Sequence, residues 1–123
     1  MMKKYDDNNI FAKILRGEIP CEKIYEDDFV LSFHDINPQK KVHALVIPKG
    51  KYIDLDDFAL NAPPEEITGL IKGINTVAKK LGISTDTGKG YRALSNISED
   101  GGQEVPHLHF HLFGGEKVGK MVQ

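Results

Sequence analysis

Three of the five histidines in this 123-residue chain stand at every second position of one short segment. They are His107, His109 and His111, and apolar residues fill the positions between and after them. Alternation with a period of two predicts a β-strand over residues 107–113, with successive side chains on opposite faces. The imidazoles should then share one face, opposite a core. The side chains expected in that core are Leu108, Phe110 and Leu112. Burying unpartnered imidazoles costs free energy, so the row favours a chemical role.

Three kinds of chemistry use histidines on one strand face. Two imidazoles in a His-x-His pattern bind zinc, and His43 from another strand could be a third ligand. An imidazole also serves as a nucleophile or as an acid and base, because its ordinary pKa lies near about 6.5. A pH-sensing patch is the third interpretation. The run contains no cysteine pair and no carboxylate, which favours catalysis over zinc binding.

A glycine pair lies shortly before the histidine segment. Gly101 and Gly102 are followed by Gln103. Glycine permits backbone conformations in which neighbouring N–H groups converge on an anion such as phosphate. Alone, such a pair indicates only a turn. Beside three aligned histidines, it favours a phosphoryl group delivered to an imidazole.

The composition limits the classes of function. The chain is long enough for a hydrophobic core, and residues 1–123 are expected to form one domain. A formal charge of −2 provides no basic field for nucleic acid. A single cysteine, Cys21, fits a reducing compartment. No apolar run approaches the roughly 20 residues of a membrane span, and the polar segment 1–9 does not resemble a signal peptide. We therefore expect a cytoplasmic protein that binds neither nucleic acid nor membranes.

The order of the predicted elements indicates an α+β domain with an antiparallel sheet. A short helix should begin near Ile10 and end before Gly17, and Pro64–Leu81 should form one long amphipathic helix. The segment 49–63 is expected to be a connection with an acidic patch at Asp54, Asp56 and Asp57. The predicted strands are 22–26, 29–34, 42–48, 91–96 and 107–113. A polar arm should precede these elements at 1–9, and a short tail should follow at 114–123.

The segment 107–113 matches the pattern His-φ-His-φ-His-φ-φ, with φ apolar, and so resembles the HIT (histidine triad) family of nucleotide hydrolases and transferases. The rest of the chain resembles the Hint branch of that family in its bacterial form. The motifs that carry this resemblance are Ile10-Phe11 with Ile14, Gly17-Glu18-Ile19-Pro20, Phe33 to Gln39, His43 with Val46-Ile47-Pro48, Asn96 and Gly101-Gly102-Gln103. They occur in the right order and cover nearly the whole chain.

The resemblance implies a fold and an activity. The fold is HIT-like, with a five-stranded antiparallel sheet, one long and one short helix, and a homodimer whose sheet has ten strands. The activity is hydrolysis of the P–N bond in AMP or GMP amides through a covalent nucleotidyl-histidine, without cofactor or metal. The implied nucleophile is His109. His111 would contact the phosphate and the leaving group, while His107 and His43 would support the nucleophile from behind.

The same resemblance implies the groups that bind the purine nucleotide. Asn96, Gln103 and backbone amides near Glu104 and Val105 would hold the phosphate, together with His109 and His111. Asp35 would accept hydrogen bonds from the ribose. The apolar slot for the base would consist of Ile10, Phe11, Ile14, Phe33 and Ile36. Several of these assignments compete with plain structural roles. Phe33 could belong to the core, and His43 could be a satisfied core histidine. Asp35 could lie in a turn that bonds its own backbone. Ile10, Phe11 and Ile14 could simply anchor the N-terminal helix.

Three departures from the family pattern bear on the substrate. Glu104 stands where animal members carry a serine that helps with the leaving group. The tail lacks the tryptophan of animal members. The N-terminal zinc motif of some relatives is missing, with Asn9 and Ala12 in that region, which predicts no bound metal. Two other functions stay open: a nucleotide-binding partner protein with vestigial hydrolysis, and a dinucleoside polyphosphate hydrolase or nucleotidyl transferase.

Overall fold

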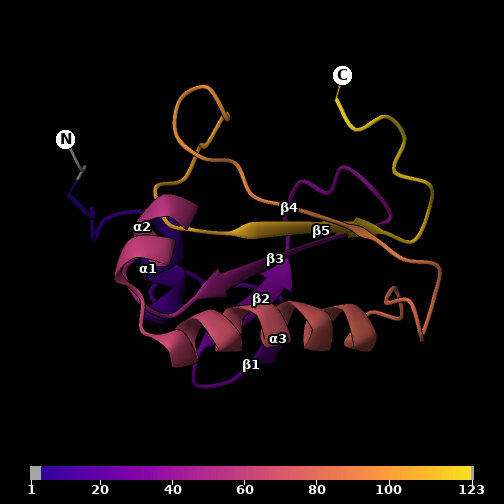
Figure 1. Cartoon of the computed structure of the whole chain (residues 1–123), viewed down its shortest axis with the longest axis horizontal. Helices are drawn as coiled ribbons and strands as arrows, with labels where there is room; N and C mark the ends of the chain where they lie inside the picture. Colours follow the sequence, from indigo (N-terminus) through magenta and orange to yellow (C-terminus); the bar gives the residue numbers. More distant parts are fainter. Residues whose placement is uncertain (1–3, 123) are drawn as a thin grey trace.

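The computed structural model describes residues 4–122. Five antiparallel strands form one sheet, as the sequence predicted (Figure 1). Their order in the sheet is β1-β2-β3-β5-β4. They are β1 (Lys23–Glu26), β2 (Val30–His34), β3 (Val42–Pro48), β4 (Arg92–Leu94) and β5 (Phe110–Gly114). The central strand β3 pairs with β2 and β5, so it joins the N-terminal and C-terminal halves of the chain.

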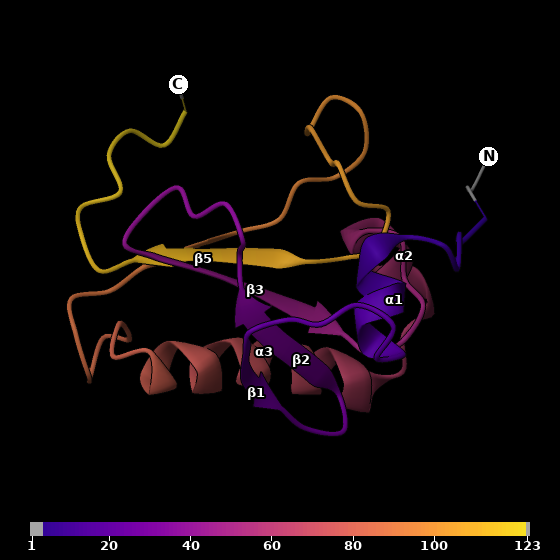
Figure 2. The same ribbon diagram turned by 180° about the vertical axis from the view of Figure 1, so that it is seen from behind.

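Three helices accompany the sheet: α1 (Ile10–Leu15), α2 (Leu55–Asn61) and α3 (Pro64–Lys80). The long helix α3 covers one face of the sheet, and the view from behind shows α1 at one end of the opposite face (Figures 1 and 2). Helix α3 ends near its predicted limit. Its first turn carries Glu65 and Glu66, which complement the positive end of the helix dipole. No helix within residues 4–122 has both the length and the apolar character that a membrane span requires.

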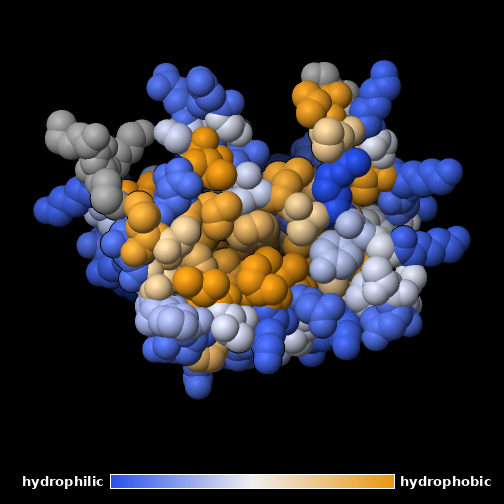
Figure 3. Space-filling view, viewed as in Figure 1, coloured by the Kyte–Doolittle hydropathy of each residue, from blue (hydrophilic) through white to orange (hydrophobic). Residues whose placement is uncertain are grey.

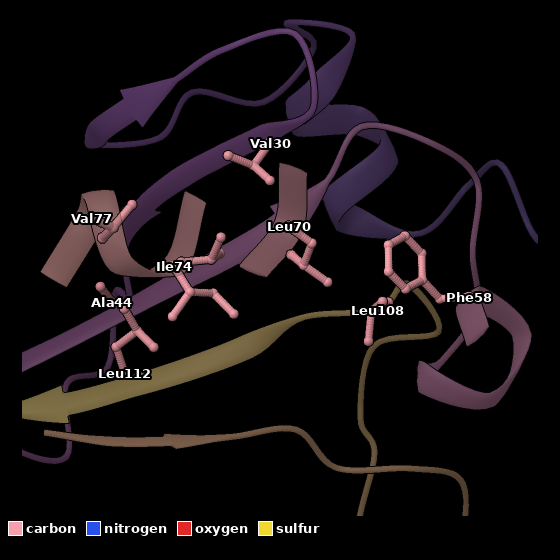
Figure 4. Close-up of a cluster of buried hydrophobic side chains, with 9 residues drawn as sticks. Val30, Ala44, Phe58, Leu70, Ile74, Val77, Leu108 and Leu112 are labelled. Atoms are coloured by element: carbon pink, nitrogen blue, oxygen red, sulfur yellow. The ribbon is translucent and has the colours of Figure 1, made fainter. Parts of the chain in front are cut away.

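Alternation along β2 and β3 supplies both faces of the sheet with a core. Toward α3, buried side chains of the strands pack with those of the helix and with Leu108 and Leu112, as the histidine-segment pattern predicted (Figure 4). Phe110 is partly buried against the same cluster. Toward α1, a second cluster contains Phe11, Leu31, Phe33, Leu45 and Ile47. The face of the sheet toward α3 is therefore covered by an apolar core. The opposite face carries a smaller apolar cluster together with polar residues.

Helix α2 was not predicted, because its acidic residues were interpreted as an acidic patch in a connection. Asp54 is the N-cap, and its carboxylate accepts the Asp57 N–H at 2.8 Å. Phe58 is the buried residue of this helix and joins the core under α3. The predicted fold with one long and one short helix is thus corrected to three helices.

The last two strands are shorter than predicted. β5 begins at Phe110 rather than at His107, because the preceding residues bond elsewhere. Pro106 has no N–H, the His107 N–H donates to Val105, and the Leu108 N–H donates to the Tyr52 carbonyl at 2.8 Å. Of the three aligned histidines, only His111 therefore lies in the ladder, and the other two lie in the segment that enters it. β4 spans Arg92–Leu94 instead of 91–96.

The arm and the tail contact the rest of the domain. The expected polar arm begins with residues 1–3, which lie outside the described residues, but Asn9 is buried and caps α1 through Ala12. In the tail, the carboxylate of Glu116 accepts the Lys41 N–H at 2.7 Å. The guanidinium of Arg92 donates to the carbonyls of Gly119 and Lys120. The tail is irregular, as expected, but these hydrogen bonds attach it to the domain.

Candidate active site

A cavity of about 510 Å³ lies on the face of the sheet that carries α1. Residues from β3, β4, β5, α1 and two loops line it. They are Phe11, Asp35, Asn37, Gln39, His43, Leu45, Leu94, Asn96, Gly102, Glu104, Val105, His109, His111 and Phe113. Three of the four histidines predicted to be functional thus share one cavity. The fourth, His107, is fully buried behind it.

The ring of His109 is held in one tautomer. Its Nδ1 lies 2.7 Å from the backbone carbonyl oxygen of His107. A carbonyl oxygen only accepts, so Nδ1 carries the proton and Nε2 keeps a free lone pair. The edge of Phe11 packs against the ring, with the centroids 4.9 Å apart. A neutral imidazole with a free, oriented Nε2 is what nucleophilic attack requires.

His107 is fixed at both nitrogens. Its Nε2 lies 2.9 Å from the Pro48 carbonyl oxygen at the end of β3, and so donates. Its Nδ1 lies 2.6 Å from the hydroxyl oxygen of Tyr5. Because a neutral ring carries one proton, Nδ1 accepts and the Tyr5 hydroxyl donates. A fully buried, doubly bonded imidazole supports its neighbours rather than contacting a substrate.

His43 and His111 form a second hydrogen-bonded pair. The backbone N–H of Gln39 donates to Nδ1 of His43 at 3.1 Å, so the proton of this ring sits on Nε2. That Nε2 lies 2.9 Å from Nδ1 of His111, which must therefore accept. The proton of His111 is left on Nε2. His111 stacks on Phe113 with the ring planes 4° apart. The pair therefore offers an N–H from His111, complementary to the bare Nε2 of His109.

Asp35 combines a turn role with a place in the cavity. Its Oδ1 accepts the Asn37 N–H at 2.8 Å, which is the turn bond considered as the alternative assignment. Its Oδ2 lies 3.4 Å from Nε2 of His43. One carboxylate oxygen therefore faces the histidine pair. The assignment to ribose stays a prediction.

Burial favours the neutral form of all four of these histidines. It lowers the pKa of His107 and of His111 to about 4, and for His111 the neighbouring imidazoles add to the effect. Burial also lowers the pKa of His109, against the opposing effects of the His107 carbonyl and of Asp35 and Glu104. The pKa of His43 is lowered by burial, with Asp35 opposing. Neutral imidazoles suit a site in which one ring attacks as a nucleophile.

The predicted phosphate ligands divide into two groups. Asn96, Glu104 and Val105 line the cavity. The Gln103 amide is already engaged, because its Nε2 donates to the carbonyls of Ile53 and Val105 and its Oε1 accepts the Ser98 N–H. Gln103 thus secures the loop in this structure. The N–H groups of Gly102 and Gln103 donate to carbonyls of the same loop, so the glycine pair shapes a turn. Backbone donors for an anion are left to Glu104 and Val105.

The five residues predicted for the base slot are dispersed. Phe11 lines the cavity. Phe33 lies in the core, 4 % exposed, which matches its structural alternative. Ile14 packs against that core, whereas Ile10 is 43 % and Ile36 88 % exposed. The cavity wall as the structure has it therefore contains one member of the slot, and the role of the others stays a prediction.

One group of possible metal ligands lies in the cavity. The ligand atoms of Asp35, His43 and His111 lie within 4.8 Å of one another. A neutral imidazole that binds a metal through Nε2 carries its proton on Nδ1. In His43 that nitrogen accepts the Gln39 N–H, so metal binding would bring two N–H groups face to face. The donor set therefore does not fit a metal ion, and metal independence stays a prediction.

Three contributors to this arrangement were not predicted from the sequence. Gln39 acts through its backbone N–H, Phe113 through stacking, and Tyr5 through its hydroxyl. Gln39 and Phe113 fall inside the motifs, but the backbone N–H of Gln39 and the apolar ring of Phe113 are not marked by residue type. Tyr5 stands alone in a polar arm, and no spacing connects it to residue 107.

The family model described as "HIT domain" matches residues 16–118. The chain belongs to the HIT family. An uncharacterised 13.2 kDa HIT-like protein of Azospirillum brasilense is 54% identical over 99% of this chain and 98% of its own. The purine nucleoside phosphoramidase of Escherichia coli K12 is 40% identical over 94% of each chain. A HIT family hydrolase from Clostridium thermocellum has a TM-score of 0.83 at 37% identity, covering 96% of this chain and 99% of its own. These matches confirm the HIT-like fold and make this chain similar to HIT family hydrolases.

Proposed function

We propose that this HIT protein hydrolyses purine nucleoside phosphoramidates through a covalent nucleotidyl group on His109. The observation that carries the proposal is the bond from His109 Nδ1 to the His107 carbonyl at 2.7 Å, which leaves Nε2 bare on a residue of the cavity wall. The phosphoramidase among the relatives supports the choice of bond to be cleaved.

The reaction has two steps. His109 Nε2 attacks phosphorus, the P–N bond to the amine breaks, and the amine leaves after taking one proton from solvent water. Water then attacks the nucleotidyl-imidazolium, releases the nucleoside monophosphate and returns one proton. The Nε2–H of His111 donates to the phosphate or the leaving group, where charge develops. Dividing one displacement into two steps avoids a direct attack of weakly nucleophilic water on the phosphoramidate.

The charge of the cavity supports an amide over a polyphosphate. Its lining carries the carboxylates of Asp35 and Glu104, and among residues 4–122 the cavity wall includes neither lysine nor arginine. A dinucleoside polyphosphate would bring several negative charges to this wall, whereas an amide brings one. Electrostatic repulsion should therefore select against the polyphosphate.

The test is a kinetic comparison of AMP and GMP amides with diadenosine polyphosphates. Efficient turnover of the amides, unaffected by EDTA, is expected. The variant Glu104→Gln should reduce the ratio of kcat/KM for the amides to kcat/KM for the polyphosphates, because it removes one negative charge. Glu99→Gln in the same loop should leave this ratio as in the wild type. Binding of AMP without turnover of any amide would instead support the nucleotide-binding partner protein.

We also propose that the protein is a homodimer. The edge strand β4 pairs with β5 on one side, so its other side is available. Helix α3 exposes two of its isoleucines, Ile67 and Ile71, with Ile71 60 % exposed. Figure 3 shows apolar side chains gathered on this face, between α3 and the projecting segments above it. Two-fold pairing would bury such a patch and satisfy the strand edge.

A further inference from the structure

Tyr5 reaches from the N-terminal arm to the buried histidine behind the cavity. Its hydroxyl oxygen lies 2.6 Å from His107 Nδ1, and the two rings meet edge to face with centroids 5.6 Å apart. The other nitrogen of His107 donates to the Pro48 carbonyl. Tyr5 is thus the donor that satisfies the remaining lone pair of this buried ring.

The arm is anchored just after this contact, on the C-terminal side of Tyr5. The carboxylate of Asp7 pairs with Lys51 at 2.9 Å, and the Asp7 carbonyl accepts from Arg16 at 2.9 Å. Asn9 then caps α1. Lys51 comes shortly after Pro48, the last residue of β3, whose carbonyl accepts the His107 N–H. The arm is therefore fastened next to the group that bonds His107. Several bonds, rather than one, place Tyr5 against the ring.

His107 transmits its position to the nucleophile in two ways. Its backbone carbonyl accepts the proton of His109 Nδ1. Its ring contacts Phe11, with centroids 6.3 Å apart, and Phe11 packs on the ring of His109. A His107 side chain fixed at both nitrogens leaves its own backbone little freedom to turn. The direction of the carbonyl, and with it the tautomer of His109, depends on that fixation.

We propose that Tyr5 is a positioning residue: by donating to His107 Nδ1 it holds this ring neutral and fixed, and thereby holds the carbonyl that orients His109. The effect on turnover rests on the proposed function, whereas the effect on the two rings does not. The groups that face His107 are the Tyr5 hydroxyl, the Pro48 carbonyl, the ring of His109 and the apolar ring of Phe11. The charged groups that act on Tyr5 are Asp7, Lys51 and Arg16, and Asp7 pairs with Lys51.

The phenol is suited to this task at neutral pH. Burial raises the pKa of Tyr5, so the hydroxyl keeps the proton that it donates. Removing that proton donor leaves a bare Nδ1 in a buried ring, and a bare nitrogen takes up a proton from solvent more readily than one that accepts a hydrogen bond. Loss of the hydroxyl should therefore raise the pKa of His107 from its low value.

The experiment compares Tyr5→Phe with Tyr25→Phe in the full chain. Tyr25 is a matched control, because its hydroxyl also makes one hydrogen bond, to Asp27 on the turn after β1. Nitrogen NMR of the ring of each histidine gives the tautomers and the titration, and steady-state kinetics on an AMP amide give kcat and KM. For Tyr5→Phe we expect His107 to titrate at higher pH, His109 to populate both tautomers, and kcat to fall about tenfold with little change in KM.

The two readouts separate the two proposals. Absence of amide hydrolysis by the wild type would overturn the proposed function, and the ring spectra would still decide the role of Tyr5. Unchanged His107 titration and unchanged His109 tautomer in Tyr5→Phe would overturn the role of Tyr5, whatever the activity. Equal changes in Tyr25→Phe would also overturn it, because they would reflect a general loss of stability.

Discussion

Nε2 of His43 donates to Nδ1 of His111 across 2.9 Å, from β3 to β5. This bond fixes the proton of His111 on the nitrogen that is free to meet a substrate. We expect His43→Ala and His111→Ala each to lower kcat by up to about 10²–10⁴-fold, the usual range for an acid–base helper. His34→Ala, at the end of β2, is the control that should retain activity. A loss of all turnover in His43→Ala would show that the pair does more than orient a donor.

Asp35 should favour ribose over 2′-deoxyribose. Its carboxylate lines the cavity, and Oδ2 is not used by the turn that occupies Oδ1. In the wild type, a 2′-deoxyribose would leave the Asp35 carboxylate without the hydroxyl that it accepts from, which disfavours the deoxy substrate. Without the carboxylate, ribose and 2′-deoxyribose should react alike. Kinetics on matched ribo and deoxyribo amides are expected to show a preference in the wild type that Asp35→Ala loses. If Asp35→Ala discriminates as the wild type does, the assignment is wrong.

The burial of His107 should make the fold sensitive to acid. The folded protein binds a proton on this ring only near pH 4, whereas the unfolded chain does so near 6.5. Between these values the unfolded state binds more protons, so the free energy of unfolding falls as the pH falls. Above pH 6.5 this contribution is complete. One such ring gives a slope of at most about 1.4 kcal/mol per pH unit, and up to roughly 3 kcal/mol over the window.

Urea unfolding at several pH values between 4 and 7.5 measures this slope. His107→Gln cannot titrate, and its amide can still donate toward Pro48, so we expect a lower starting stability and a shallower fall with acid. A His107→Gln slope equal to that of the wild type would mean that this ring is not the source.

Much of the fold could be predicted from the sequence because local patterns carry it. Helix α3 has a complete set of local signals, with proline and glutamates at its start and lysines before Gly82. The runs of apolar residues in β2 and β3 predict both strands. Helix α2 had a capping signal in Asp54 and Asp57, but its seven residues make only about two helical turns, too few to produce a clear period.

The parts that escaped prediction depend on side chains bonding to distant backbone. β5 begins late because Leu108 bonds to Tyr52, and Ser95 donates to the His109 carbonyl instead of continuing a ladder. The tautomers of the histidines depend on the Gln39 N–H and on the Pro48 carbonyl. Residue type and spacing do not encode such contacts. The set of histidines was predictable, whereas the direction of each proton was not.

The proposed dimer should depend on the exposed face of α3. Ile71→Asp places a carboxylate in the apolar patch and should shift the protein from dimer to monomer at micromolar concentration. Lys72→Asp changes the next residue, on a different side of the same helix, and should remain dimeric. Sedimentation velocity distinguishes the two states. A wild type that sediments as a monomer at this concentration contradicts the proposed pairing.

His109→Ala should abolish turnover of an AMP amide while leaving AMP binding largely intact. The variant removes the attacking nitrogen but not Asp35, Asn96 or the loop that would hold the nucleotide. The loss should exceed that of any helper, since no other described residue offers a bare nitrogen in the same place. Calorimetric titration with AMP checks binding, and kinetics check turnover. Weak binding of AMP by His109→Ala would show that the His109 ring binds the nucleotide rather than attacking phosphorus.

The central claim is that Nε2 of His109 attacks phosphorus, and rapid acid-free quenching of the wild type with an AMP amide tests it most directly. Peptide mass analysis of the quenched protein is expected to find one adenylyl group per chain, on His109, rising and decaying within a turnover. An adduct on His111 or on another residue would contradict the mechanism. So would turnover at the full rate with no adduct on His109 at any time.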